Sequence, residues 1–216
     1  MTRSPRTTEP TGSQRTAEEE RREAAVRRYQ NGDSRAFAQV FDAYYPMVSG
    51  VLFKLMGDNR DMEDVIQTVF LEVHRCIHRF EWQSRFSTWV YRIAVNVALQ
   101  HMRREKLRRP VDTGEREPWL QLMDPDNPER SVIHRETFDR IQAILSQIPV
   151  KKRVVFVLSD IQGLGAEQIS EVLDLPRKKV YARLFQARRT FHEKVKRDPY
   201  FQERYGSGSR GTKDAG

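Results

Sequence analysis

Residues 167–197, EQISEVLDLPRKKVYARLFQARRTFHEKVKR, carry the pattern that decides the fold of this chain. The apolar side chains of residues 167–173 recur at helical spacing and therefore share one side of a short helix. Residues 174–176, Asp-Leu-Pro, predict a turn, and a second helix is predicted to start directly after it. A short helix, a tight turn and a longer helix form a helix-turn-helix, which places its second helix in the major groove of DNA.

The second helix of this unit has two contrasting faces, at about 100° of rotation per residue. Its apolar face consists of Val180, Leu184, Ala187 and Phe191. Its opposite face is cationic, amide-bearing and aromatic, and it consists of Lys178, Ala182, Phe185, Gln186 and Arg189, with Tyr181 on the flank. Residues 177–197 hold nine Lys or Arg and one acid, Glu193, whereas an ordinary solvated helix mixes both signs. The pattern therefore favours binding in a DNA groove over a plain charged surface.

The composition of the whole chain agrees with a nucleic-acid partner. The 216 residues carry a formal net charge of +8, which raises affinity for polyanions such as nucleic acid or an anionic membrane. Net charge alone also fits an ordinary basic soluble protein, so the placement of the charges decides. Since 38% of the residues are apolar and 31% are charged, we expect two small cores rather than one wide core.

The sequence predicts that the protein stays in the cytoplasm, without membrane insertion. Its single cysteine, Cys76, cannot form an internal disulfide and gives no support for export. Residues 1–23 have no apolar centre and do not form a secretory signal. No apolar run approaches the roughly 18 residues that a membrane-spanning helix needs.

Proline and charge divide the chain into domains and connections. Residues 24–107 and 137–197 show apolar periodicity and are predicted to be domains. Residues 1–23 and 198–216 are predicted to be tails, the first of them disordered, because they are polar or rich in Gly and Ser. The acidic segment 108–136 is predicted to be a flexible linker, because prolines block a continuous helix at Pro110, Pro118, Pro125 and Pro128.

The first domain shows helical spacing throughout. Its clearest stripe consists of Met62, Val65, Ile66, Val69, Val73 and Ile77. An earlier helix, with apolar residues from Phe37 to Tyr44, is expected to break or restart at Pro46. No convincing two-residue alternation occurs, so a sheet is excluded. The predicted fold class is all-α, with two small helical domains joined by a flexible linker and a helix-turn-helix in the second.

The outer face of the helix that begins near Asp61 is acidic and cannot favour DNA, because carboxylates repel phosphate. This face consists of Asp64, Gln67, Thr68, Leu71 and Arg75. An exposed Leu71 beside polar residues is typical of a protein contact, with an apolar anchor and a polar rim. An ordinary solvated helix side is the alternative.

A cluster of cations ends the first domain, at Arg103, Arg104, Lys106, Arg108 and Arg109. Aromatic residues precede it, at Phe80, Trp82, Phe86, Trp89 and Tyr91. Aromatic side chains beside cations suit single-stranded DNA, whose unstacked bases need new stacking partners. Burial in the core is the alternative for Phe80, Phe86 and Trp89, whereas Trp82 lies in a predicted loop, residues 81–85.

Two longer stretches resemble a known family. Residues 61–70, DMEDVIQTVF, followed by Phe80 and by residues 86–96, FSTWVYRIAVN, resemble region 2 of bacterial sigma factors. The chain resembles region 4 of these factors at Ile148-Pro149, RVVF at 153–156, Gly163-Leu164, EQI at 167–169, Pro176 and VYARLFQAR at 180–188. The resemblance is to the small extracytoplasmic-function (ECF) group of the sigma-70 family, with both regions in the family's order and spacing.

This resemblance implies a sigma factor, which binds core RNA polymerase, directs transcription initiation to specific promoters and aids promoter melting. The expected partners are core RNA polymerase, promoter DNA and an anti-sigma factor. The DNA would be double-stranded at the −35 element and single-stranded at the −10 element, and the linker would thread through the polymerase. No enzymatic activity, cofactor or metal is expected.

The resemblance also distributes roles over the residues. Core polymerase is expected to contact Asp61, Asp64, Gln67 and Leu71. The −10 element is expected to contact Phe80, Trp82, Gln83, Ser84, Asn96, Arg103 and Arg104. The −35 element is expected to contact Arg177, Lys178, Lys179, Tyr181, Ala182, Arg183, Phe185, Gln186 and Arg189.

The chain departs from the family pattern where promoter choice is decided. Family members often have Gly near Trp82, and Lys178-Lys179 replaces a common Gly-Thr. Tyr181 and Gln186 stand where Arg is common. The promoter sequence is therefore expected to differ from the family's usual one. Gly165 stands where a polar helix cap is usual, so the first helix of the helix-turn-helix is expected to fray.

Two other classes of function remain open. A free-standing helix-turn-helix regulator explains residues 137–197 but leaves the acidic helix without a role, and cosedimentation with core polymerase separates the two. For an enzyme, His74 and His78 have a metal-binding spacing of four residues. No third ligand is evident and the pair lies near a core stripe, so no metal site is predicted.

Overall fold

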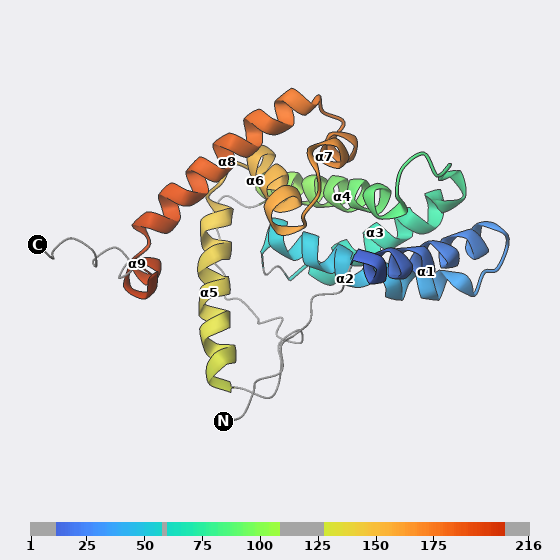
Figure 1. The fold of residues 1–216 in the computed structure, drawn as a ribbon, viewed down its shortest axis with the longest axis horizontal. Helices are drawn as coiled ribbons and strands as arrows, with labels where there is room; N and C mark the ends of the chain where they lie inside the picture. Colours follow the sequence, from blue (N-terminus) through green and yellow to red (C-terminus); the bar gives the residue numbers. More distant parts are fainter. Residues whose placement is uncertain (1–11, 58–59, 109–127, 206–216) are drawn as a thin grey trace, which may run out of the picture.

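The computed structural model describes residues 12–57, 60–108 and 128–205, and helices make up most of them (Figure 1). In chain order they are α1 Gly12–Gln30, α2 Ala36–Met56, α3 Met62–Cys76, η1 Ile77–Arg79, α4 Phe86–Arg108, α5 Pro128–Ser146, α6 Val150–Phe156, η2 Val157–Ile161, α7 Ala166–Leu173, α8 Arg177–Arg197 and α9 Pro199–Tyr205. No strand occurs within these residues, which confirms the all-α prediction.

The first domain is built around α2, against which α1, α3 and α4 all pack. Its buried side chains recur at helical spacing, so each helix presents one apolar side to the others. The largest fully buried ones in this domain are Val26, Val40, Tyr44, Val48, Leu52, Leu55, Ile77 and Phe86. The predicted stripe of α3 is buried as a whole.

Pro46 does not break the second helix, contrary to the sequence expectation, and α2 runs through it without interruption. Proline removes one backbone hydrogen bond from a helix interior. The helix continues because Val40 and Tyr44 before the proline, and Val48 and Val51 after it, are all buried in the same core. Burial on both sides outweighs the lost hydrogen bond.

The second domain packs α6 against α8 and closes it with α5 and α7. Leu145, Ile148, Phe156 and Ala187 form one buried cluster, with Phe191 packed on it. After α6 the helix widens into the π-helical turn η2, which buries Val157 and Leu158. The helix-turn-helix, α7 and α8, lies on the outside of this core (Figure 1).

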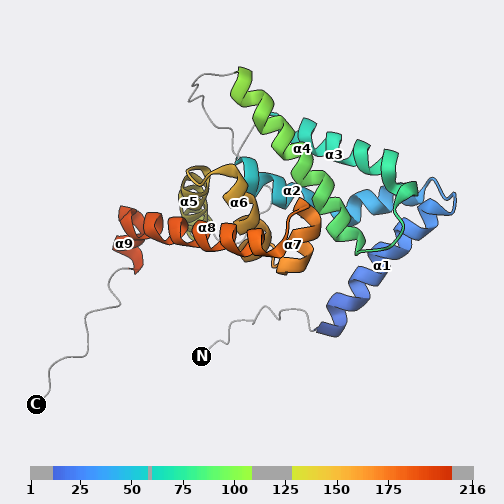
Figure 2. The same ribbon diagram turned by 90° about the horizontal axis from the view of Figure 1, so that it is seen from above.

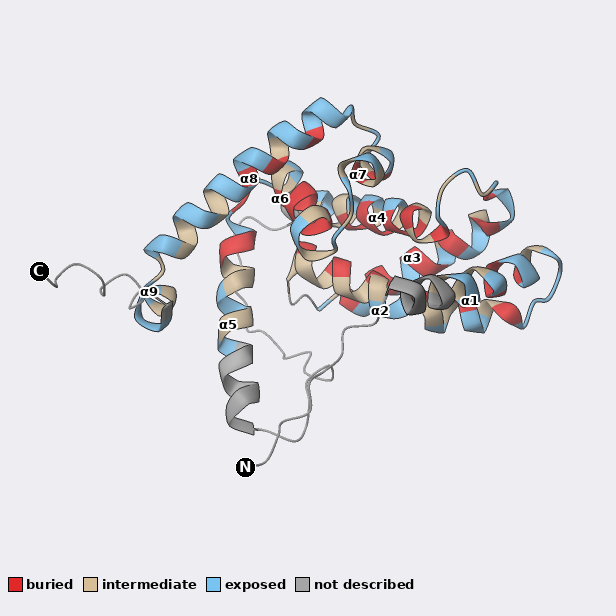
Figure 3. Ribbon diagram, in the orientation of Figure 1, coloured by how far each residue is buried: buried red, intermediate tan, exposed pale blue. Residues whose placement is uncertain are grey.

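The two domains share one continuous core, so the expectation of two separate cores is wrong. Helix α7 packs on α4, and both η2 and α5 pack on α2. Buried residues therefore run from α2 and α4 into α6 (Figure 3). The composition suggested two small cores because the polar segments at both ends and in the middle of the chain lower the average share of apolar residues.

Three helices begin inside segments that were predicted to be tails or a linker. Helix α1 begins at Gly12 inside the predicted tail, α5 begins at Pro128 inside the predicted linker, and α9 begins at Pro199 inside the second tail. Pro128 and Pro199 start their helices, where a missing N–H is no loss, although proline is also read as a breaker. The remaining parts of these segments, 1–11, 109–127 and 206–216, lie outside the described residues.

Tertiary contacts explain why α5 and α9 are helical. The ring of Phe138 in α5 stacks on Phe53 of α2, with centroids 5.1 Å apart and an interplanar angle of 16°. The hydroxyl groups of Tyr200 in α9 and Thr137 in α5 are hydrogen-bonded to each other. Both contacts join segments far apart in the sequence, so periodicity within either segment could not show them.

Candidate nucleic-acid and protein interfaces

The turn of the helix-turn-helix is set by Asp174, which has a left-handed backbone with φ of +49°. Asp tolerates this conformation better than most residues. The N–H of Leu175 donates to the carbonyl oxygen of Ser170 at 3.0 Å and closes the end of α7. At its start the N–H of Gly165 donates to Oε1 of Gln168 at 3.0 Å. Gln168 thus replaces part of the missing cap and corrects the expectation of fraying.

The outer face of α8 stays in solvent as a unit. Tyr181 is 60% exposed and Phe185 is 68% exposed, which is unusual for such large apolar side chains. The other exposed members of the predicted −35 set are Arg177, Lys178, Lys179, Ala182, Gln186 and Arg189, whereas Arg183 is half-buried. The opposite side of the helix buries Val180, Leu184 and Ala187.

Ion pairs fix the position of α8 on its domain. The guanidinium of Arg188 donates two hydrogen bonds to the carboxylate of Asp160, at 2.7 and 2.8 Å. These hydrogen bonds hold the pKa of Asp160 below its usual value. Arg177 pairs with Glu167 of α7 at 2.8 Å, which bridges the two helices of the motif. Arg177 is thus a structural partner as well as a candidate phosphate ligand.

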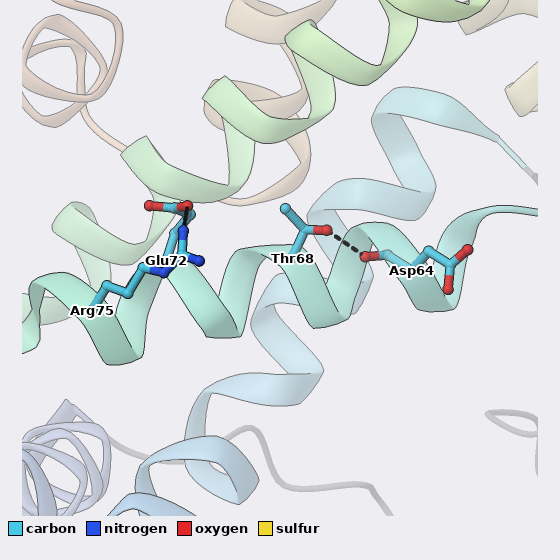
Figure 4. A network of polar contacts seen from close by, with 4 residues as sticks. All are labelled: Asp64, Thr68, Glu72 and Arg75. Carbon is cyan, nitrogen blue, oxygen red and sulfur yellow. Dashed lines mark hydrogen bonds and ion pairs between the residues drawn. The ribbon is translucent and has the colours of Figure 1, made fainter.

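The outer face of α3 carries Asp64, Gln67 and Leu71 in one exposed line, as predicted. Leu71 is 52% exposed. Thr68 donates to the carbonyl oxygen of Asp64 at 2.7 Å, and Arg75 pairs with Glu72 at 2.9 Å, so the polar residues bond along the helix (Figure 4). The carboxylates of Asp64 and the side chain of Leu71 stay available to a partner.

Asp61 does not join this line. Its carboxylate Oδ2 lies 3.4 Å from Nε2 of His101 in α4. It therefore contributes to the contact between the start of α3 and the end of α4. Glu105 reaches the same imidazole nitrogen at 3.8 Å.

A groove of about 430 Å³ runs between α2 and α3 beside the exposed line. It is lined by Phe37, Phe41, Tyr45, Glu63, Ile66, Gln67, Phe70, Leu71 and His74. Sequence reasoning missed the contribution of α2, because helical spacing placed Phe37 and Phe41 in the core. The groove combines an apolar floor with acidic and amide groups at its edge.

The loop between η1 and α4 carries the aromatic residues that were expected to contact the −10 element. Phe80 is only 7% exposed and packs against Phe86 and Trp89, so in this structure little of its ring is accessible for the −10 contact that the sequence predicts. Trp82 is half-buried rather than free in its loop, because its indole N–H donates to Oε1 of Gln30 at 2.8 Å. Gln83 is exposed and Ser84 half-buried.

Helix α4 presents a polar stripe to solvent. Asn96, Arg103 and Arg104 are exposed, as predicted. Arg92 lies four residues before Asn96 on the same side and is also exposed. Sequence reasoning missed Arg92, although its spacing from Asn96 could have revealed it. The exposed side chains carry positive charge and two amides, Asn96 and Gln100, along the helix.

His74 of α3 and His78 of η1 both pack against aromatic rings. The ring of His74 meets Phe37 edge-on at 4.8 Å, and the ring of His78 lies 5.0 Å from that of Tyr29. Among the described residues, Asp61, His101 and Glu105 could hold a metal ion, because one ligand atom of each lies within 4.8 Å of the others. Without a metal ion, the same three residues form a histidine paired with two carboxylates.

None of the helices in the described part of the chain is long and apolar enough to cross a membrane.

Comparison with known proteins assigns both domains. The family model of sigma-70 region 2 matches residues 40–108, and that of sigma-70 region 4 matches residues 138–191. These two regions define the class as bacterial transcription initiation factors. The chain belongs to the sigma-70 family of RNA polymerase sigma factors, in its ECF group. Its partners are accordingly core RNA polymerase and promoter DNA.

Relatives and solved structures agree with this assignment. The chain is 31% identical to the ECF RNA polymerase sigma-E factor of Haemophilus influenzae, over 80% of the chain and 94% of that protein. It is 32% identical to the RNA polymerase sigma-H factor of Pseudomonas aeruginosa, over 79% of the chain and 91% of that protein.

Two solved structures share its fold. One is CnrH in complex with the cytosolic domain of CnrY, with a TM-score of 0.61, 21% identity and coverage of 81% of this chain and 97% of CnrH. The other is the sigma factor RpoE of Bartonella quintana in complex with the anti-sigma factor NepR. Its TM-score is 0.60, with 17% identity and coverage of 75% of this chain and 98% of that one.

Proposed function

We propose that this sigma factor reads the −35 element with α8 and holds the melted −10 strand with α4 and the preceding loop. Core polymerase docks on the groove between α2 and α3. The outer face of α8 carries this proposal, because it exposes two large aromatic side chains among cations while its opposite side is buried. Such a face has no role in the fold and suits the major groove.

The groove-facing side of α8 combines two kinds of DNA contact. The exposed cations Lys178, Lys179 and Arg189 are suited to phosphates, which position the helix but carry little sequence information. Gln186 is exposed on the same face and can pair with the N6 and N7 groups of adenine. Arg at this position would instead favour guanine.

The polar stripe of α4 supports the −10 assignment. Arg92, Arg103 and Arg104 can neutralise phosphates of a single strand, while Asn96 offers a donor and an acceptor to a base. The aromatic loop stands at the start of the same helix. A strand bound along α4 would therefore reach the loop at one end and the cationic cluster at the other.

The groove between α2 and α3 supports docking of a polymerase element. Leu71 and Tyr45 are exposed and apolar, and Glu63 and Asp64 stand beside them. Such a surface suits a helix that presents apolar and basic side chains. DNA is disfavoured here because of the carboxylates.

Promoter binding requires the two domains to separate. The −35 and −10 elements lie about 25 base pairs apart, or roughly 85 Å at 3.4 Å per base pair. Helix α4, with 23 residues, spans only about 35 Å, and α7 packs directly on it. We call this packing of the two domains the closed arrangement. It cannot place α4 on the −10 element and α8 on the −35 element at the same time.

An anti-sigma factor is the third partner that we propose. The two solved structures with the same fold are complexes with CnrY and with the anti-sigma factor NepR. A partner that binds the closed arrangement would shift the population away from the promoter-competent one.

Run-off transcription with purified core polymerase tests the proposed function. We expect promoter-specific transcripts only when the chain and core are both present, and cosedimentation of the two. A free-standing helix-turn-helix regulator is the competing function. Sequence-specific DNA binding at full strength by the chain alone, without association with core, would establish that function instead.

A further inference from the structure

The indole ring of Trp82 is anchored at its edge and covered on one face. Its Nε1–H donates to Oε1 of Gln30 at 2.8 Å. The guanidinium carbon of Arg27 lies 3.6 Å from the ring centroid, and Phe80 packs on the ring at 5.1 Å with an interplanar angle of 59°. Figure 2 shows the loop between α3 and α4 beside α1, which supplies both Gln30 and Arg27.

Gln30 fixes the loop as well as the ring. Its Nε2 donates to the carbonyl oxygens of Ile77 at 2.7 Å and of Phe80 at 2.9 Å, while its Oε1 accepts from Trp82. Both ends of the amide are therefore engaged, and the side chain cannot rotate without losing three hydrogen bonds. The orientation of the indole is set from α1 before any ligand arrives.

The backbone at Trp82 shows that this arrangement opposes a local preference. Its φ of +60° lies in the left-handed region, which glycine adopts freely and a bulky residue rarely does. Such a conformation persists only where surrounding contacts hold it. A glycine would form this loop with less strain, so the presence of tryptophan at this position suggests that its indole ring has a function.

Arg27 occupies the ring face as a planar ligand would. It is an exposed residue, whereas Trp82 is half-buried, so the guanidinium covers the indole from the solvent side. Phe80 and Trp89 pack within the aromatic cluster, and Phe80 is buried. Within the described part of this loop, Trp82 is the ring that a base could reach by displacing an exposed side chain, that of Arg27.

We infer that Arg27 holds the place of one unpaired nucleobase, which displaces it and stacks on the indole of Trp82 while Gln30 keeps the ring in position. The inference rests on the proposed function and deepens it, since it adds a stacking subsite at a position where relatives often have glycine. An exposed cation–π contact contributes about 2- to 5-fold in affinity, whereas base stacking on an aromatic side chain contributes about 5- to 150-fold. The base therefore displaces the guanidinium, which is then free to approach a phosphate.

The test measures binding of the full-length chain to labelled dT12 and dA12 single strands by fluorescence anisotropy. Trp82→Gly removes the ring and keeps the backbone conformation, so we expect about 5- to 150-fold weaker binding. Arg27→Ala is compared with Arg28→Ala, which removes the same charge from the next position of α1. Arg28 contacts Gln39, whereas Arg27 is the cation that lies over the indole.

Removing a guanidinium that competes with the base should raise the affinity for single-stranded DNA, whereas removing a phosphate contact should lower it. We expect Arg27→Ala to bind about 2- to 5-fold more tightly than Arg28→Ala, and this difference to vanish when both are combined with Trp82→Gly. A direct readout uses the chain with Trp89 and Trp119 replaced by Phe, in which the single strand should quench the emission of Trp82.

Three results would overturn the inference. They are equal binding by Trp82→Gly and the wild type, equal binding by Arg27→Ala and Arg28→Ala, and unquenched Trp82 emission at saturating single strand. The proposed function is judged separately by run-off transcription. A chain that initiates transcription but binds dT12 equally with and without the indole retains the function and lacks the subsite.

Discussion

The phenol hydroxyl of Tyr91 in α4 donates a hydrogen bond of 3.1 Å to Oε1 of Gln162, directly after η2, and so joins the two domains. Burial raises the pKa of Tyr91 to about 12, so the hydroxyl keeps its proton at physiological pH. Nε2 of Gln162 is buried without a hydrogen-bond partner. The contact between the domains is therefore specific but incompletely satisfied, which suits an interface that must open.

Tyr91→Phe should loosen the closed arrangement. The substitution removes the hydrogen bond that Oε1 of Gln162 accepts from Tyr91, and a buried polar group left without a partner costs about 1–3 kcal/mol. We expect a larger radius of gyration in small-angle X-ray scattering. Tyr45→Phe, at an exposed position of α2, is the control. An unchanged radius in Tyr91→Phe would show that this hydrogen bond does not hold the domains together.

Arg153→Met should strengthen the closed arrangement. Arg153 is 9% exposed, its Nε has no hydrogen-bond partner, and its Nη2 lies 3.6 Å from Sδ of Met102 across the domain contact. Burial lowers the pKa of the guanidinium, which means that the charge is poorly accommodated. An apolar side chain of similar length should raise the free energy of unfolding by about 1–4 kcal/mol.

Thermal melting and the rate of promoter binding in the presence of core polymerase measure this effect. A more stable closed form should bind the promoter more slowly, because we propose that the domains separate before promoter binding. Lys151→Met removes an exposed charge two residues earlier and should change neither quantity. A lower melting temperature in Arg153→Met would mean that the cation contributes to the interface instead of weakening it.

Gln186→Arg should change promoter choice at one −35 position. The Gln amide matches adenine and the Arg guanidinium matches guanine, and a good bidentate pair discriminates by about 1–3 kcal/mol, or about 5- to 150-fold. Selection from a randomised −35 library by both proteins measures the preference. The −10 preference is the internal control and should not move. If both proteins select the same −35 bases, Gln186 does not read DNA.

Asp64→Arg combined with Leu71→Arg should weaken association with core polymerase. The pair removes an acidic group and an apolar anchor from an exposed line of α3, so the fold and the −35 contacts should persist. A loss of about 2 kcal/mol or more is expected where an interface anchor is removed. Asp139→Arg, which repeats the charge reversal of Asp64→Arg at an exposed position of α5, is the control. Equal affinities for core would exclude the α3 face.

Asp160→Asn should destabilise the protein at neutral pH and less so in acid. Hydrogen bonds from Arg188 lower the pKa of Asp160 in the folded state, so the pair stabilises the fold above the usual pKa of the carboxyl. This stability is lost as the pH falls through the lowered folded value. We expect about 1 kcal/mol at pH 7, since Arg188 is half-exposed and solvent screens the pair.

Melting curves across this pH range measure the difference between Asp160→Asn and the wild type. Glu193→Gln, which alters a more exposed pair with Arg189 at 3.7 Å, should have little effect at any pH. A difference that stayed constant from neutral to acid would contradict the ionic origin of the stabilisation.

Most of the helix faces could be predicted from the sequence, because helical periodicity is a local property. The apolar and polar sides of α8 and the outer line of α3 are where their spacing places them. The predictions failed where contacts between residues far apart in the sequence decide the bounds of a helix. Burial of residues on both sides of Pro46 keeps α2 continuous, and packing of Phe138 on Phe53 extends the second domain.

The sequence by itself determined the family, the all-α fold and the exposed faces of the two helices that we propose to contact DNA, since each rests on residues close together in the chain. Only the tertiary structure decided that the two domains share one core and that Trp82 lies between Gln30 and Arg27. It also showed that Phe80 is buried and that α2 contributes to a groove beside α3. The shared core and the position of Trp82 depend on contacts between segments about 50 or more residues apart, and local periodicity carries no information about such contacts.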